Sequence, residues 1–255
     1  MAALRHTARY EIRGFDCDLR GRVHPRTLCL LLQEAATAHA AELGVGVDLL
    51  IDRGIAWVLS QLKVDMARWP MAGETIVVET WPEAASGTRT DRRFRILDGD
   101  EVAIGGATTL WLILDLERRR PTRLPDLITS KLDDVVASER PTRLDRLPAL
   151  ADPGFETTTT VSYSDLDMVH HANNAAFVQW IVDSVAESLW STHVPAELEV
   201  HYLAECRHGE HVLSQSEMLD GPGPQTVLHR LSRVSDGTEA ARARTVWRPS
   251  TARDQ

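Results

Sequence analysis

Two segments of the chain place hydrophobic residues at the spacing of a helix with one buried face. The shared spacing is i, i+3, i+4, i+7 and i+8. These positions hold Leu28, Leu31, Leu32, Ala35 and Ala36 in the first segment, and Phe177, Trp180, Ile181, Ser184 and Val185 in the second. The pattern predicts a first helix from about Arg26 to Leu43, capped by Gly44, and a second helix that begins near Asn173.

Four segments follow each predicted helix, and we expect them to be strands because β-branched and aromatic residues are frequent in them. They cover residues 56–66, 75–81, 89–97 and 102–116 in the first half, and 197–204, 212–219, 226–234 and 240–248 in the second. The dipeptides Asp98-Gly99 and Asp236-Gly237 are typical of tight turns. They predict that the last two strands of each set form a hairpin.

The two halves share a sequence repeat. The segment from Asp16 and Asp18 to His24 has a counterpart 149 residues later, which begins at Asp165 and Asp167. Two copies of a long helix followed by an antiparallel sheet predict an α+β fold. We expect one domain over residues 1–120 and another over 158–255. The proline-rich connection over 121–157 is expected to hold a short helix around 126–139.

Composition narrows the possible functions. The 255 residues are 43% hydrophobic and 25% charged, and the net charge of −9 disfavours nucleic-acid binding. No apolar run has the length of a membrane helix, and the N-terminus has no apolar core like that of a signal peptide. The three cysteines Cys17, Cys29 and Cys206 are too few for a disulfide framework and lack zinc-site spacing. We therefore expect a cytoplasmic protein without a metal or cofactor.

Four regions together carry a family resemblance. They begin with Leu32-Gln-Glu-Ala-Ala-Thr-Ala-His, Gly73-Glu-Thr-Ile-Val-Val-Glu-Thr-Trp, Trp111 followed by Arg118-Arg-Arg-Pro-Thr-Arg, and Asp165-Leu-Asp-Met-Val-His-His-Ala-Asn-Asn with Glu205-Cys206 downstream. With these residues the chain resembles the acyl-acyl carrier protein thioesterases of plant plastids and bacteria. The resemblance implies two tandem hot-dog domains, each a long helix wrapped by an antiparallel sheet, and hydrolysis of fatty acyl thioesters.

The resemblance also implies where catalysis takes place. In that family the N-terminal domain houses the acyl chain, for which Trp57 is a candidate lining residue, and the C-terminal domain is catalytic. The family pattern Asp-x-Asn-x-His, followed by Glu-Cys, selects Asp167, His171, Glu205 and Cys206. Val169 stands at the asparagine position and cannot replace the hydrogen bonds of an amide.

Thioester hydrolysis needs an activated water and a stabilised oxyanion. A partly buried carboxylate is a suitable general base because burial raises its pKa. Glu205 is assigned this role and Asp167 a positioning role, with the reverse also open, and the part played by His171 is undecided. The helix beginning near Asn173 offers N–H groups to an oxyanion. Taken alone, Asp167 is equally suited to capping a helix, and Cys206 is better suited to packing than to attack.

The expected partner is acyl carrier protein, which is acidic. Attraction to this acidic chain would require a local basic patch, and the candidates are Arg118, Arg119, Arg120 and Arg123, with Arg89, Arg92 and Arg93 beside them. Two alternatives are an acyl-coenzyme A thioesterase of the same fold and a non-catalytic acyl-binding protein, which Val169 favours. Monomer and homodimer both fit two fused hot-dog domains.

Overall fold

The computed structural model describes residues 5–136 and 145–251. In these residues eleven strands form one antiparallel sheet, ordered β1-β3-β4-β5-β2-β8-β11-β10-β9-β7, with β6 paired to β5. The first half contributes β1 His6–Glu11, β2 Ile55–Met66, β3 Thr75–Ser86, β4 Arg89–Leu97, β5 Ala103–Asp115 and β6 Arg120–Thr122. The second half contributes β7 Phe155–Thr160, β8 His193–Tyr202, β9 His211–Leu219, β10 Gln225–Arg233 and β11 Glu239–Pro249.

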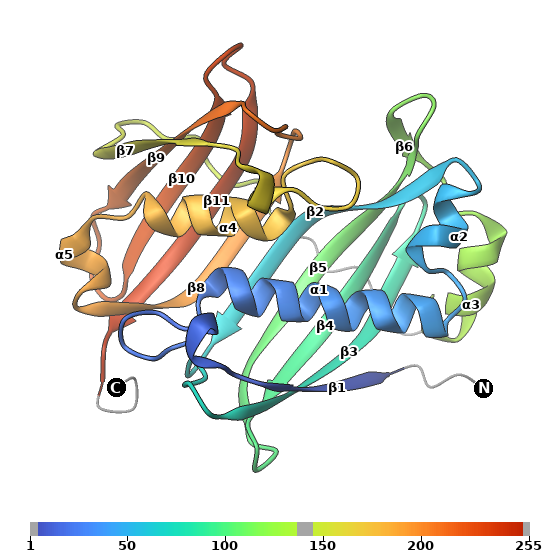
Figure 1. Cartoon of the computed structure of the whole chain (residues 1–255), viewed down its shortest axis with the longest axis horizontal. Helices are drawn as coiled ribbons and strands as arrows, with labels where there is room; N and C mark the ends of the chain where they lie inside the picture. The colour runs from blue at the N-terminus through green and yellow to red at the C-terminus, as the bar shows by residue number, and fades with distance from the viewer. Residues whose placement is uncertain (1–4, 137–144, 252–255) are drawn as a thin grey trace.

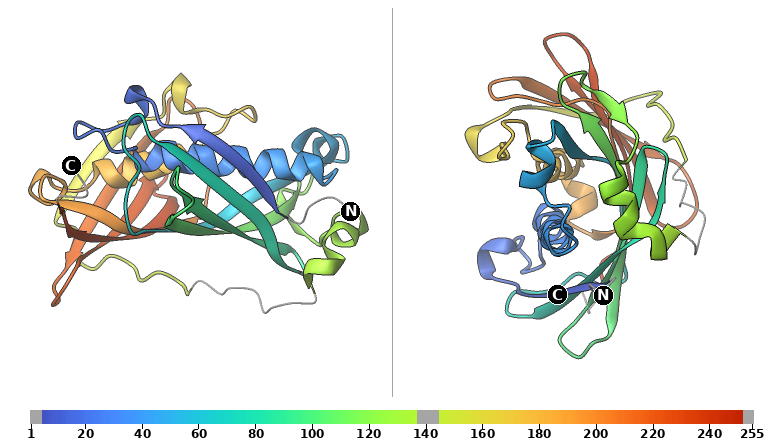
Figure 2. Two further views of the ribbon diagram at one scale, coloured as in Figure 1. Left: turned by 90° about the horizontal axis from the view of Figure 1, so that it is seen from below. Right: turned by 90° about the vertical axis from the view of Figure 1, so that its right-hand side faces the viewer.

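The helices lie on one concave face of this sheet, as Figures 1 and 2 show. They are α1 Pro25–Glu42, α2 Val47–Ile51, α3 Asp126–Val136, α4 Asn174–Asp183 and α5 Glu187–Trp190, with the 3-10 turns η1 Gly14–Asp16 and η2 Tyr163–Asp165. Residues 145–154 run along the opposite face (Figure 2). No helix within the described ranges combines the length and hydrophobicity that crossing a bilayer requires.

The repeat predicted from the sequence appears as a pseudo-twofold arrangement. Five strands on each side occupy matching places in the sheet, and β2 pairs with β8 where the two halves meet. In this pairing Leu62 lies opposite Val200, and both belong to a hydrophobic cluster that also contains Leu32 and Ile181 from the two long helices. The halves therefore share one core.

The predicted elements are confirmed, with the three strands β1, β6 and β7 added. The eight predicted strands and both hairpins form, and α1 ends as expected, with Gly44 at a φ of +73°. The edge strands β1 and β7 were not predicted because their sequences, HTARYE and FETTTT, contain no hydrophobic run. The predicted helix in the connection forms over Asp126–Val136, and residues 137–139 lie outside the described part.

The two long helices differ in length. α1 has 18 residues, whereas α4 has 10 and ends at Asp183. The helical spacing was expected to include Ser184 and Val185, but Ser184 instead caps the helix, and its hydroxyl donates to the carbonyl of Ile181 at 2.8 Å. The second half therefore has no counterpart to the last two turns of α1.

Candidate active site

Asp167 folds the loop that leads into α4. Its Oδ1 atom accepts hydrogen bonds from the backbone N–H groups of Val169 at 3.0 Å and His171 at 3.2 Å. Asp165, which is buried, closes the turn before it by accepting from the N–H of Ser162 at 3.0 Å. These bonds fix the backbone at His171.

The first half contains the same loop without the same chemistry. Asp18 accepts from the N–H groups of Arg20 at 2.8 Å and Arg22 at 3.0 Å, as Asp167 does 149 residues later. Gly21 has a φ of +78° where His170 has +63°. His170 therefore adopts a left-handed conformation that glycine adopts freely, and its exposed side chain agrees with a surface role. Because both halves keep these bonds, they serve the fold of the loop.

His171 and Glu205 form the centre of the site. The Nε2 atom of His171 lies 3.2 Å from Oε2 of Glu205, and about 30% of each side chain is exposed. The other Glu205 oxygen, Oε1, accepts from Arg119 and from Arg207, each at 2.7 Å. The sequence therefore predicted the two partners of this pair, but not the two arginines that flank it.

The electrostatics of Glu205 differ from the expectation. Partial burial raises its pKa, but the hydrogen bond from Arg207, the charge of His171 and the contact with Arg119 together outweigh burial. The net effect holds the pKa of Glu205 below its usual range. The prediction that burial brings this carboxyl towards neutrality is therefore wrong, because two guanidinium groups stabilise the carboxylate.

The second oxygen of Asp167 accepts no hydrogen bond from the described residues. In the first half Oδ2 of Asp18 accepts from Nε and Nη2 of Arg22 at 3.0 and 2.8 Å. At the matching position His171 leaves Asp167 Oδ2 without a hydrogen bond from the described residues. Replacing arginine by histidine thus frees one carboxylate oxygen beside the His171–Glu205 pair.

The remaining predicted residues have structural contacts. Asn173 caps α4, since its Oδ1 accepts from the N–H of Ala175 at 2.8 Å. Cys206 is fully buried, and burial raises the pKa of its thiol to about 12, which suits packing and not nucleophilic attack. The Val169 side chain is half exposed, so only its backbone takes part in the loop.

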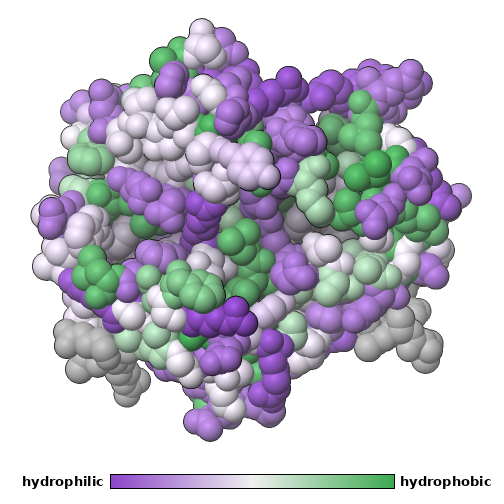
Figure 3. All heavy atoms as spheres, in the orientation of Figure 1, coloured by the Kyte–Doolittle hydropathy of each residue, from purple (hydrophilic) through white to green (hydrophobic). Residues whose placement is uncertain are grey.

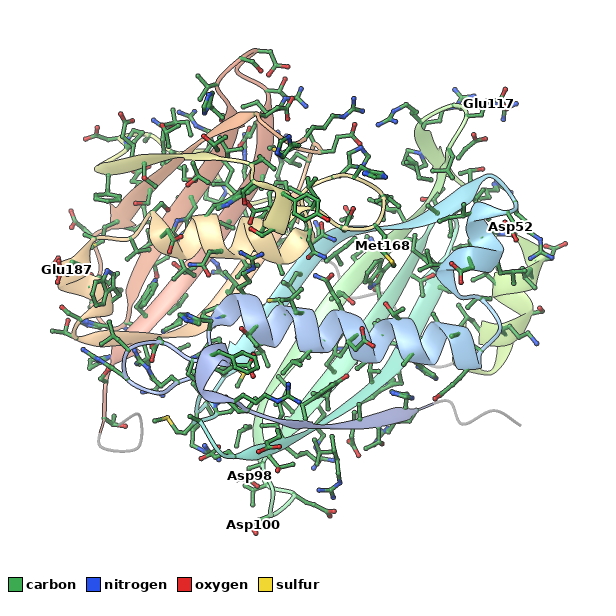
Figure 4. The ribbon with its side chains drawn as sticks, viewed as in Figure 1. Asp52, Asp98, Asp100, Glu117, Met168 and Glu187 are labelled. Atoms are coloured by element: carbon green, nitrogen blue, oxygen red, sulfur yellow. The ribbon has the colours of Figure 1, made fainter. Side chains whose placement is uncertain are left out.

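The predicted basic patch divides into three parts. Arg118, Arg120 and Arg123 are exposed around the β5–β6 hairpin, whose tip Glu117 marks in Figure 4. Arg119 is directed to Glu205 instead. On β4, Arg89 and Arg93 pair with Asp91 and Glu83, and Arg92 is buried, so its assignment to a docking surface is wrong.

A cavity of about 70 Å³ lies in the first half. Its wall is mainly apolar and includes Ala36 and Ala40 of α1, Trp57 of β2, Trp111 of β5 and Ile128 of α3. Figure 4 shows Met168 on the loop of the second half, on the side that faces α1 and β2 of the first. The loop that holds His171 and the cavity thus belong to different halves of the chain.

Arg92 is the unexpected residue of this cavity. Its Nη1 donates to the hydroxyl of Thr80 at 3.1 Å and lies 3.0 Å from Nδ1 of His39. Burial lowers the pKa of Arg92 to about 10. The sequence contained evidence that Arg92 is buried. Alternate residues of a strand share one face, and this places Arg92 with Thr90, Phe94 and Ile96.

The chain is similar to known proteins over most of its length. Residues 3–132 match the model of the acyl-ACP thioesterase N-terminal domain, and residues 150–249 match that of the C-terminal domain. The acyl-[acyl-carrier-protein] hydrolase FATB3 of Cuphea viscosissima chloroplasts is 26% identical over 95% of this chain. The dodecanoyl-[acyl-carrier-protein] hydrolase of Cinnamomum camphora chloroplasts is 28% identical over 86%. The chain spans 62% and 61% of the lengths of these two relatives.

Solved structures show the same fold. The 12:0-ACP thioesterase from Umbellularia californica superposes with a TM-score of 0.86 at 23% identity, covering 98% of this chain and 96% of its own. A putative oleoyl thioesterase from Lactobacillus plantarum gives 0.87 at 22% identity, covering 97% of both chains. The predicted α+β double hot-dog fold is thereby confirmed.

Proposed function

The chain belongs to the acyl-acyl carrier protein thioesterase family, and from this membership we propose that it hydrolyses fatty acyl thioesters of acyl carrier protein to free fatty acid and the carrier thiol. The observation that carries the proposal is the His171–Glu205 contact of 3.2 Å, at the loop of the second half on its side towards α1 and β2 (Figure 4). Such a pair, partly exposed and held by fixed neighbours, is suited to activating water.

In the proposed reaction the oxygen of a water molecule attacks the thioester carbonyl carbon. The proton of the water passes to the Glu205–His171 pair, either to Glu205 directly or to His171 with Glu205 stabilising the imidazolium. The tetrahedral intermediate then collapses, the C–S bond breaks, and the sulfur leaves and takes up a proton. The carboxylate of Glu205 is ionised at neutral pH because its pKa is lowered, so it is ready to accept a proton, although it is a weaker base.

Asp167 is proposed to act on the same centre from the side. One of its oxygens holds the loop, and the other is open beside His171. This open oxygen is placed to orient the attacking water or the histidine ring.

The acyl chain is proposed to enter the first half, in the domain expected over residues 1–120. The cavity there is apolar along α1 and is closed by α2 and α3, whose Leu50 and Ile128 share a buried cluster. A chain longer than the cavity has to displace these side chains. The buried guanidinium of Arg92 then marks where an aliphatic chain becomes unfavourable, because the cation has no carboxylate partner among the described residues.

Acyl carrier protein is proposed as the carrier because exposed Arg118, Arg120 and Arg123 surround the hairpin beside Glu205. An acyl-coenzyme A substrate would follow the same chemistry with different docking. The cytoplasmic location stays a prediction, and the two curated relatives are named as chloroplast proteins.

The test is thiol release from dodecanoyl carrier protein and dodecanoyl coenzyme A by wild type and Glu205→Gln. We expect the substitution to lower turnover about 10²-fold or more while the protein stays folded. Glu187→Gln, at the exposed end of the second half, is the matched control (Figure 4). If wild type and Glu205→Gln are equally inactive on both substrates, the acyl-binding alternative replaces hydrolysis. If the two proteins are equally active, the assignment of the His171–Glu205 pair is rejected.

A further inference from the structure

The loop of the first half borders a second cavity. It has a volume of about 330 Å³, compared with about 70 Å³ for the acyl cavity. One side is formed by Arg20, Arg22 and Trp69 of the first half, and the other by Val182, Asp183 and Trp190 of the second. The internal repeat relates the loop of the first half to the catalytic loop of the second half. This cavity therefore lies beside the first loop at the position that corresponds to the catalytic site.

The residues that make the catalytic loop reactive are replaced here. Arg22 stands where the second half has His171. The N–H of Val23 binds the carbonyl of Pro70, and the N–H of Ala172 binds that of Cys206, so the residues preceding these acceptors, Trp69 and Glu205, also correspond. The site therefore has a cation and an indole in place of the imidazole and the carboxylate. It cannot perform the same water activation, yet it keeps space for a ligand.

The chemistry of the wall is amphipathic. The Arg22 side chain is only 10% exposed, and its Nη1 atom has no hydrogen-bond partner in the described part of the chain. Its other two nitrogens bind Asp18, which compensates one charge. Arg20 donates to the carbonyl of Ser191 and to the hydroxyl of Ser250 in the second half. A second guanidinium thus lies on the same side, with tryptophan opposite it.

Asp183 also lines this cavity. Unlike Asp18, it does not form a hydrogen bond with either arginine in the described part of the chain. It ends α4, accepts from Gln179 at 2.7 Å, and burial raises the pKa of its carboxyl. The buried Nη1 atom of Arg22, which has no hydrogen-bond partner within the described ranges, is the donor that an anion in this cavity can reach. The indoles of Trp69, Trp190 and Trp247 supply apolar surface for a chain.

We propose that this cavity is a second, non-catalytic site that binds a single-chain fatty carboxylate, with the carboxylate at Arg20 and Arg22 and the chain against the tryptophans. The inference rests on the proposed function for its biological meaning, since a fatty carboxylate is the product of that reaction. Because both halves line the site, an occupant bridges them and inhibits hydrolysis without competing for the acyl cavity.

The test is the stoichiometry of dodecanoate binding by titration calorimetry, using the full chain. Wild type is expected to bind two molecules. Val182→Trp fills the second cavity and is expected to bind one while retaining hydrolysis, and Gln179→Trp, on the neighbouring turn, is the replacement if Val182→Trp does not fold. Ala40→Phe is the matched control that fills the acyl cavity; it should also bind one molecule, but lose hydrolysis.

Inhibition by dodecanoate gives an independent measurement. A non-competitive component in wild type that disappears in Val182→Trp supports the second site. One bound molecule in wild type, or two in a folded Val182→Trp, overturns it. Absence of thiol release by wild type contradicts the proposed function alone, because the binding stoichiometry does not depend on turnover.

Discussion

Arg119 of the first half donates a 2.7 Å hydrogen bond to Oε1 of Glu205 in the second half. Arg207 donates to the same oxygen, and His171 contacts the other. Arg119 lies on the hairpin between β5 and β6 with a φ of +52°, a backbone conformation that non-glycine residues seldom adopt. A residue from the first half therefore helps to lower the pKa of the proposed catalytic carboxylate.

Removing this contact should move the pH dependence of the reaction. Arg119 contributes to the lowered pKa of Glu205, so Arg119→Ala should raise that pKa. A general base works only when deprotonated, so the acid limb of kcat/KM should shift to higher pH. The measurement is a pH profile with a soluble dodecanoyl thioester. Arg118→Ala is the control, and superimposable profiles for wild type and Arg119→Ala would contradict the coupling.

His171 should be indispensable. His171→Ala removes the only side chain among the described residues that contacts Oε2 of Glu205, and turnover should fall about 10²- to 10⁴-fold. Neighbouring His170→Asn provides the control, because the His170 side chain is exposed and asparagine readily adopts the φ of +63° found there. The kcat of each variant decides the matter, and a folded His171→Ala protein with near-normal turnover would exclude the pair.

Val169→Asn should keep activity or raise it. The Val169 side chain is half exposed, so asparagine fits without repacking, and its amide can add a hydrogen bond worth about 0.5–1.5 kcal/mol. This corresponds to a gain of about ten-fold at most. Single-turnover rates measure the change directly. A large loss in a stable variant would show that valine has a role of its own in this site.

The exposed arginines can be tested without disturbing Glu205. The double reversal Arg118→Glu with Arg120→Glu should raise KM for dodecanoyl carrier protein and leave KM for a small soluble thioester unchanged. Electrostatic attraction weakens as salt rises, so the difference between wild type and variant should shrink at high ionic strength. The control is Arg53→Glu, an exposed position next to α2. Its surroundings differ from those of the hairpin, because hydrophobic residues, including the exposed Leu49 and Ile51, gather over α2 (Figure 3). Equal effects on both substrates would reject docking at the hairpin.

Arg92→Met should favour longer acyl chains. The substitution replaces a buried cation by an apolar side chain, and each additional methylene buried is worth about 0.8 kcal/mol. Tetradecanoyl is longer than dodecanoyl by two methylenes, so the ratio of kcat/KM for tetradecanoyl to dodecanoyl carrier protein should rise by up to about 15-fold. Arg95→Met, exposed on the same strand, controls for the loss of charge. An unchanged ratio would place the end of the chain elsewhere.

Local sequence patterns predicted most of the fold, because helix and strand periodicities decide which face of each element is buried. The same patterns failed for β1 and β7, whose threonine and charged residues give little hydrophobic signal at the sheet edges. The Arg119–Glu205 contact was beyond such reasoning, since it joins residues 86 positions apart across two halves. Arg92 was wrongly assigned to the docking surface because Arg92 and Arg93 are both basic and adjacent. In a strand, neighbouring side chains point to opposite faces, and Arg92 is the buried one.

The unequal lengths of α1 and α4, 18 and 10 residues, have a consequence for how the molecule can change. In a symmetric dimer of single units every substitution would appear twice, once beside each loop. Here both halves lie in one chain and the last two turns of α1 are not repeated as a continuation of α4, so a mutation at Ala36 or Ala40 alters the cavity of the first half alone. Substrate choice and bond cleavage can thus be adjusted by independent mutations within a single chain.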